Sequence, residues 1–139
     1  TIFDKSRRHN FFILSNCGIV INNTERIYMS IYCIKIKYTK EAIRGMMEEG
    51  IDRADAMRNL TEALGGKLLS FYGMVGQHYH AMAISEVPEY ANLSAGIVTA
   101  MMANTLEDYK VIPLYESSDI IKVSTMYKQV INSYKKPGD

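Results

Sequence analysis

The sequence predicts one α+β domain, in which a four-stranded antiparallel sheet carries helices on one face. Residues 30–38 alternate apolar and lysine side chains, and this period of two is typical of a strand with one buried face. Residues 51–64 and 120–134 repeat apolar side chains at helical spacing instead. Two segments rich in β-forming residues, 67–75 and 78–86, flank a glycine turn, which indicates an antiparallel hairpin.

The composition is that of a globular domain with one core. The chain has 139 residues, of which 47% are apolar and 22% charged, with a net charge of +1. No apolar run approaches the roughly 20 residues that cross a bilayer, so no membrane partner is expected. From residue 29 onward 12 basic and 13 acidic residues balance, so no nucleic-acid partner is expected either. Cys17 and Cys33 indicate reduced thiols in a cytoplasmic protein.

Residues 1–28 differ from the rest of the chain. Their basic stretch and four apolar residues only superficially resemble a signal peptide, because the apolar run is too short. The first methionine is Met29, and it opens a clean strand. We therefore expect residues 1–28 to be a disordered or upstream extension and residues 29–139 to be the domain.

The first helical unit follows the strand at 30–38. A loop or short helical turn is expected up to Gly50, and the first main helix from Ile51 to Leu64. Gly65 and Gly66 end that helix, because glycine accepts the left-handed conformation of a C-terminal cap.

The hairpin comes next in the chain. The second strand covers residues 67–75, Gly76 and Gln77 form a two-residue turn, and the third strand covers residues 78–86. Pro88 suits the first turn of the following helix, which runs to about Ala103.

That helix is expected to turn Leu93, Ile97, Ala100 and Met101 inward. Its small residues, Gly96 among them, permit close packing on the sheet.

The C-terminal part adds a strand and a helix. The fourth strand is expected at residues 109–115. Its Pro113 predicts either an edge strand or an unpaired position for the proline, because proline cannot donate a ladder hydrogen bond. Ser117 or Ser118 is expected to cap a final helix from Asp119. The order β-α-β-β-α-β plus a terminal helix is the ferredoxin-like arrangement.

Several segments resemble the GYD domain family. The stretch LTEALGGKLLSFY, followed by the turn and a tyrosine-containing strand, is similar to that family, as is the opening strand SIYCIKIKYT. The resemblance covers about residues 29–134 and implies a ferredoxin-like fold of the dimeric α/β-barrel group. It implies a homodimer or higher homo-oligomer as well, but little chemistry, because the family's function is largely unassigned.

The family's namesake Gly-Tyr-Asp element is altered in this chain. Tyr79 matches its tyrosine, and His80 stands where the aspartate is expected. Gly76 lies one residue further from Tyr79 than usual. A role that depends on the aspartate is therefore in doubt here.

The candidate catalytic residues are His78, Tyr79 and His80. The two histidines lie two residues apart on the expected third strand, so their imidazoles are predicted to point to the same face. They could then act as a general base or bind a metal, although no third ligand is signalled nearby. Solvated or interface histidines are the commoner alternative, so neither a metal nor a cofactor is predicted.

Tyrosines supply the candidate ligand-binding residues. Tyr32, Tyr72, Tyr79 and Tyr115 could line an apolar pocket with a few hydroxyls for orientation. Filling of the core or of an interface is the commoner use of such phenols.

Two functions follow from these patterns. The first is a homodimeric module that binds a small apolar or aromatic molecule between sheet and helices, or serves assembly alone. The alternative is a cofactor-free monooxygenase-like or isomerase-like enzyme, with His78 or His80 as base and Tyr72 or Tyr79 orienting the substrate. This alternative rests on analogy between folds.

Overall fold

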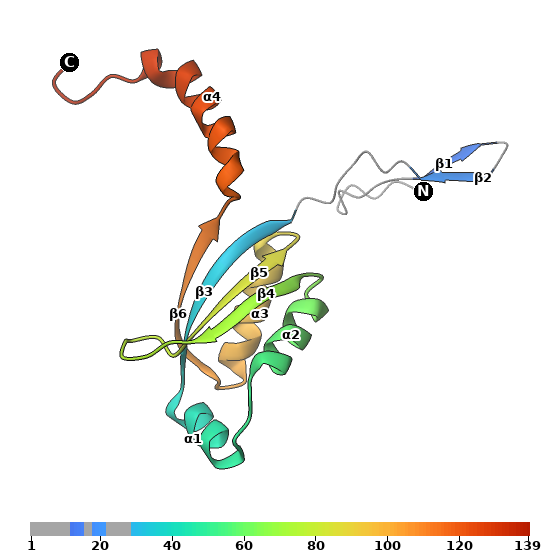
Figure 1. Ribbon diagram of the computed structural model, residues 1–139, viewed down its shortest axis with the longest axis vertical. Helices are drawn as coiled ribbons and strands as arrows, with labels where there is room; N and C mark the ends of the chain where they lie inside the picture. Colours follow the sequence, from blue (N-terminus) through green and yellow to red (C-terminus); the bar gives the residue numbers. More distant parts are fainter. Residues whose placement is uncertain (1–11, 16–17, 22–28) are drawn as a thin grey trace.

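The computed structural model describes residues 12–15, 18–21 and 29–139. The last range folds around a four-stranded antiparallel sheet with the strand order β4-β5-β3-β6 (Figure 1). The strands are β3 (Ser30–Tyr38), β4 (Lys67–Gly73), β5 (Ala81–Val87) and β6 (Leu106–Leu114). The predicted α+β class is confirmed, and the order fits the ferredoxin-like arrangement.

Two further strands lie before the domain. β1 (Phe12–Ser15) and β2 (Gly18–Ile21) pair antiparallel. Most of residues 1–28 lies outside the described residues, so the expectation of an extension there stays a prediction.

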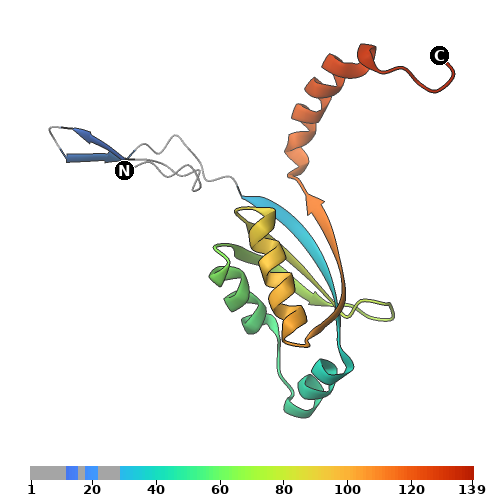
Figure 2. The same ribbon diagram turned by 180° about the vertical axis from the view of Figure 1, so that it is seen from behind.

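Helices α2 (Ala54–Ala63) and α3 (Tyr90–Met102) cover one face of the sheet (Figure 2). Alternate residues of the two central strands turn toward them, as a period of two requires. This covered face carries the buried side chains Ile34, Ile36, Tyr38, Ala81, Ala83, Ser85 and Val87. We call the opposite side of the sheet the open face.

Helix α1 (Lys40–Glu49) occupies residues for which we expected a loop or a short turn. The Thr39 hydroxyl accepts from the backbone N–H of Ala42 at 3.1 Å and caps the helix. Gly50 ends it at φ 64°. The sequence signal is weak because charged residues outnumber the apolar residues that pack on the core, which are Ala42, Ile43 and Met46.

Helix α2 begins later than the sequence suggests. Ile51 is exposed, and the carboxylate of Asp52 accepts from the backbone N–H of Ala54 at 2.8 Å. This bond, two residues along the chain, forms an Asx turn that leads the chain into the helix, whose N-cap position is Arg53. The true start is therefore Ala54.

The predicted glycine end of α2 is confirmed. Gly65 has φ +80°, and its N–H donates to the carbonyl of Glu62 at 2.9 Å. The N–H of Gly66 donates to the carbonyl of Thr61, also at 2.9 Å. This pair of bonds is a Schellman cap, which needs a left-handed residue at the position of Gly65.

The predicted two-residue hairpin turn is wrong. β4 ends at Gly73 and β5 begins at Ala81, so His78 and His80 lie in the connecting loop. Figure 1 shows this loop projecting beyond the sheet. The chain pairs at the base of the loop, where Met74 donates to the carbonyl of His80 at 2.8 Å. We call residues 74–80 the histidine loop.

Helix α3 and strand β6 also depart from expectation. Met101 is 45% exposed although we expected it to face inward, because it lies about 100° around the helix from Ala100. Asn104 at φ 55° ends the turn after α3, and β6 then starts at Leu106. Pro113 does lie on an edge strand, as predicted.

The other edge strand, β4, is irregular. Its register against β5 shifts between Leu68 and Ser70, as in a β-bulge.

The C-terminal helix α4 (Ile120–Val130) extends away from the sheet (Figure 1). Short 3₁₀ turns precede and follow it, at Ser117–Asp119 and Ile131–Ser133. The expected cap by Ser117 or Ser118 is not formed, because those residues belong to the first 3₁₀ turn and Asp119 precedes α4 without a side-chain cap bond. Every residue of α4 is exposed, including the apolar Ile120, Ile121, Val123, Met126, Tyr127 and Val130.

Candidate functional site

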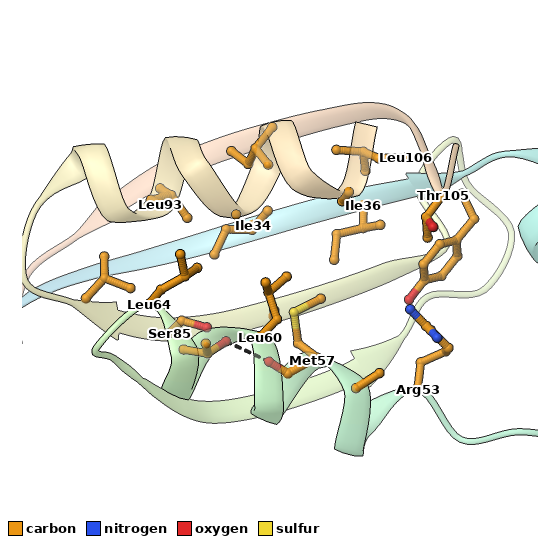
Figure 3. Close-up of a pocket in the computed structure, with 18 residues that line it drawn as sticks. Ile34, Ile36, Arg53, Met57, Leu60, Leu64, Ser85, Leu93, Thr105 and Leu106 are labelled. Carbon is orange, nitrogen blue, oxygen red and sulfur yellow. Dashed lines mark hydrogen bonds between the residues drawn. The ribbon is translucent and has the colours of Figure 1, made fainter. Parts of the chain in front are cut away.

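A cavity of about 110 Å³ lies between the covered face of the sheet and helices α2 and α3 (Figure 3). Strands β3 and β5 form its floor, and the two helices form its walls. Most of its lining is apolar, including Ile34, Ile36, Met57, Leu60, Leu64, Ala83, Val87, Leu93, Ile97 and Ala100. A pocket with such a lining favours an apolar guest.

Ser85 is the unusual polar residue of the cavity floor. Ser85 is 3% exposed, and its hydroxyl makes no hydrogen bond with any residue in the described part of the chain. Thr61 differs, because its hydroxyl donates to the carbonyl of Met57 at 2.8 Å. A buried hydroxyl without a partner costs free energy, so Ser85 offers a ligand or a water molecule an unused hydrogen-bonding group.

Arg53 and Tyr38 form one end of the cavity. Figure 3 shows Arg53 and Thr105 at that end, and Leu64 and Ser85 toward the other. Burial raises the pKa of the Tyr38 hydroxyl, and the charge and hydrogen bond of the Arg53 guanidinium partly offset that shift. Tyr38 is therefore a neutral phenol at physiological pH.

A second cavity of about 200 Å³ adjoins the first at this end. Arg53 and Thr105 line both cavities. The second cavity is also lined by residues of α1, among them Glu49, and its lining is more polar than that of the first. Arg53 consequently stands where an apolar chamber meets a polar one.

His80 lies outside both cavities and bonds to β3. The imidazole Nδ1 of His80 accepts from the backbone N–H of Tyr38 at 3.0 Å. The backbone N–H of His80 donates to the carbonyl of Ile36 at 2.8 Å. Its ring also stacks on that of Tyr38, with centroids 6.1 Å apart and planes 4° apart. Strand β5 starts one residue later, at Ala81, and does not pair with the N–H of Tyr38. The imidazole thus provides the acceptor that this backbone donor needs.

His78 and Tyr79 lie further out on the histidine loop. His78 Nε2 is 2.8 Å from the carboxylate of Asp108, and its ring meets Tyr79 edge-on at 4.8 Å. The hydrogen bond from His78, together with one from the backbone N–H of Tyr109, lowers the pKa of Asp108. The exposed His78–Asp108 pair connects the histidine loop to β6.

The structure does not bring the candidate tyrosines together. Tyr32 shares the covered face with Ile34, and Tyr72 pairs with Met82 on the open face. Tyr115 follows β6 and is exposed. None of these residues lines the cavity, nor do Tyr79 and the two histidines.

Within the described residues, no three side chains of histidine, cysteine, aspartate or glutamate gather as a metal site requires. In the same part of the chain, no helix has the length and apolar character to span a membrane.

The family model of the GYD domain matches residues 32–123, more than half of the chain. The chain belongs to the GYD family. No curated protein matches it significantly. The resemblance inferred from the residues is confirmed. The matched GYD domain ends within α4, so the outer part of that helix lies beyond it.

The glycines of the GYD segment hold the cavity walls in place. A Cβ atom on Gly66 would lie 2.3 Å from the backbone carbonyl oxygen of Glu86, so only glycine allows this approach of α2's end to β5. A Cβ atom on Gly96 would lie 2.7 Å from a methyl group of Leu64. The small residue of α3 thus permits close packing on the end of α2, where we expected packing on the sheet.

Sequence reasoning missed the polar residues of this GYD cavity. Arg53 falls within the helix expected from Ile51 to Leu64, yet it precedes α2 and lines the cavity. Ser85 carried a usable signal, because it interrupts the otherwise apolar alternation of Ala81, Ala83 and Val87.

Proposed function

We propose that this GYD domain binds a small apolar or aromatic molecule in the cavity between sheet and helices. The observation that carries the proposal is an apolar cavity whose floor holds the buried Ser85 hydroxyl without a partner among the described residues. Binding sites for small molecules are typically apolar, with a few polar groups that fix orientation. Ser85 and Arg53 are the polar groups that can orient a ligand in this cavity.

The size of the cavity limits the ligand. Its volume of about 110 Å³ is of the same order as the roughly 150 Å³ apolar cavity that accepts benzene in an engineered protein. A single ring or a short hydrocarbon chain therefore matches it.

Neutral probes test the proposal directly. We expect 1-hexanol or toluene to shift the amide NMR signals of cavity residues in the full chain and to raise its melting temperature. Ala100→Leu, which adds volume to the lining, should abolish the shifts. Ala91→Leu on the exposed side of the same helix is the matched control and should leave binding unchanged.

Ser85→Ala separates orientation from simple filling. Removing a buried hydroxyl without a partner should leave the free energy of unfolding unchanged or raise it. The affinity for hexanol should fall while that for toluene stays the same, since only hexanol can use the hydroxyl. Absence of any probe binding at millimolar concentration would refute the proposed function.

We also propose that a second copy of the chain covers the open face. This face carries apolar side chains at successive register positions, namely Ile31, Ile84, Ile112 and Leu114. Tyr72 beside them is 61% exposed. Large apolar surfaces of this kind favour association.

Sedimentation at micromolar concentration tests this assembly. The wild-type chain should sediment as a dimer or larger homo-oligomer, and Ile112→Glu should reduce its mass to that of a monomer. Met47→Glu changes an exposed residue of α1 away from the sheet and serves as the control. A stable wild-type monomer would refute the assembly.

A further inference from the structure

We propose that the natural ligand is an unbranched aliphatic monocarboxylate, whose chain lies in the apolar cavity and whose carboxylate binds Arg53. The inference rests on the proposed function, because it names the ligand class of the same cavity. The shape of the cavity and the surroundings of Arg53 support this ligand class.

The cavity is long for its volume. On β5 its lining reaches Val87, which pairs with Ser30 of β3, and on β3 it reaches Tyr38. Eight residues of strand separate these levels, so the lining is extended along the strands. A volume of about 110 Å³ along such a length leaves a narrow channel. A narrow apolar channel fits a hydrocarbon chain better than a ring system.

Arg53 supplies a cation at one end of this channel. It forms none of the ion pairs found among the described residues, and its charge acts on the hydroxyl of Tyr38. A guanidinium has five donors in a fork that matches a carboxylate. A neighbouring phenol oxygen can take up at most two of these donors, so most of them are available to a ligand.

The acidic residues nearby limit the charge of the ligand. Glu49 lines the adjoining cavity with Arg53, whereas the carboxylate of Asp52 lines neither cavity and accepts from the backbone N–H of Ala54. Among the described residues that line the two cavities, Arg53 is the sole cation and Glu49 the sole carboxylate, so the site favours a single negative charge over a dianion such as phosphate. The polar chamber beyond Arg53 gives the carboxylate access to water.

Hexanoate and 1-hexanol form the probe pair, because they share the hydrocarbon chain and only hexanoate carries a negative charge that Arg53 can bind. With the full chain at neutral pH and low salt, calorimetry should give an affinity for hexanoate at least about tenfold higher than that for hexanol. High salt should reduce this ratio, since the added affinity is electrostatic.

Arg53→Gln should bring the two affinities together, and Arg53→Lys should keep part of the preference. Arg58→Gln is the control, because it removes an exposed arginine of α2 that pairs with Asp55. Glu49→Gln should strengthen hexanoate binding, because it removes a competing negative charge.

The outcomes separate the two proposals. Equal affinity for hexanoate and hexanol in the wild-type chain would overturn the carboxylate inference and leave the apolar binding function intact. Binding of neither probe would refute both. The comparison needs only the wild-type protein, so it stands even where an Arg53 variant fails to fold.

Discussion

The two faces of the sheet follow the same alternation but end in different surroundings. On the covered face, Ile36 is 5% exposed beneath α2 and α3. On the open face, Lys35 and Ile84 lie against no helix of the described chain and are half-buried. A period of two therefore separates the faces of a strand, but it does not reveal what covers each of them. On the covered face the partner is within the chain, and we propose that on the open face it is a second chain.

The largest expected effect comes from truncating one apolar residue on each face. Ile36→Ala should lower the free energy of unfolding by about 3 kcal/mol, because it leaves a hole in the helix-covered core. Ile84→Ala should cost about 1 kcal/mol in a dilute monomer, and more at high concentration, where the second copy buries it. Urea denaturation at two protein concentrations measures both. Equal, concentration-independent losses would contradict the difference between the faces.

Gly66→Ala tests the covered face at its edge. A methyl group there collides with the backbone of Glu86, so we expect a loss of about 2 kcal/mol. Gly45→Ala in α1 is the control, because no atom lies within 4 Å of the added Cβ and the helix gains about 0.5–1 kcal/mol. Thermal unfolding compares them. A neutral Gly66→Ala would mean that α2 and β5 can separate at no cost.

The histidine loop offers a smaller contrast. His80→Ala leaves the N–H of Tyr38 without its acceptor and should cost about 1 kcal/mol. His78→Ala removes only an exposed pair and should stay within about 0.5 kcal/mol of the wild type. His80→Asn, which offers another acceptor, should recover part of the loss. If His78→Ala proved the more damaging variant, the assigned roles would be reversed.

The smallest effect is a dependence on pH. The pKa of Asp108 lies below its usual 3.8 in the folded chain, so its contribution to stability is fully present above that pH. It is lost as the pH falls through the lowered pKa. The difference in unfolding free energy between wild type and Asp108→Asn should therefore stay constant at neutral pH and shrink below pH 3.8. His78→Ala should weaken this acid dependence, and an unchanged profile would count against the pair.

The parts predicted well are those with a strong local pattern. The alternation in β3 gave its bounds, and the glycine pair after α2 gave the cap. The histidine loop was misjudged because Gly76 resembles a turn residue, whereas the pairing depends on His80 meeting distant Ile36. The position of a cavity between sheet and helices was expected, but its lining was not. A cavity is the space left between side chains of several elements, and no single segment encodes it.

The edges of the sheet also affect how chains can associate. β6 carries Pro113, which has no N–H to offer another strand, and the register of β4 shifts between Leu68 and Ser70. Proteins use prolines and bulges of this kind to prevent strands of other molecules from extending a sheet. Both edges are obstructed, which agrees with our proposal that a second copy binds the open face. Contact through one face closes into a finite pair, so the same edges that shape the fold also protect it from growth into fibrils.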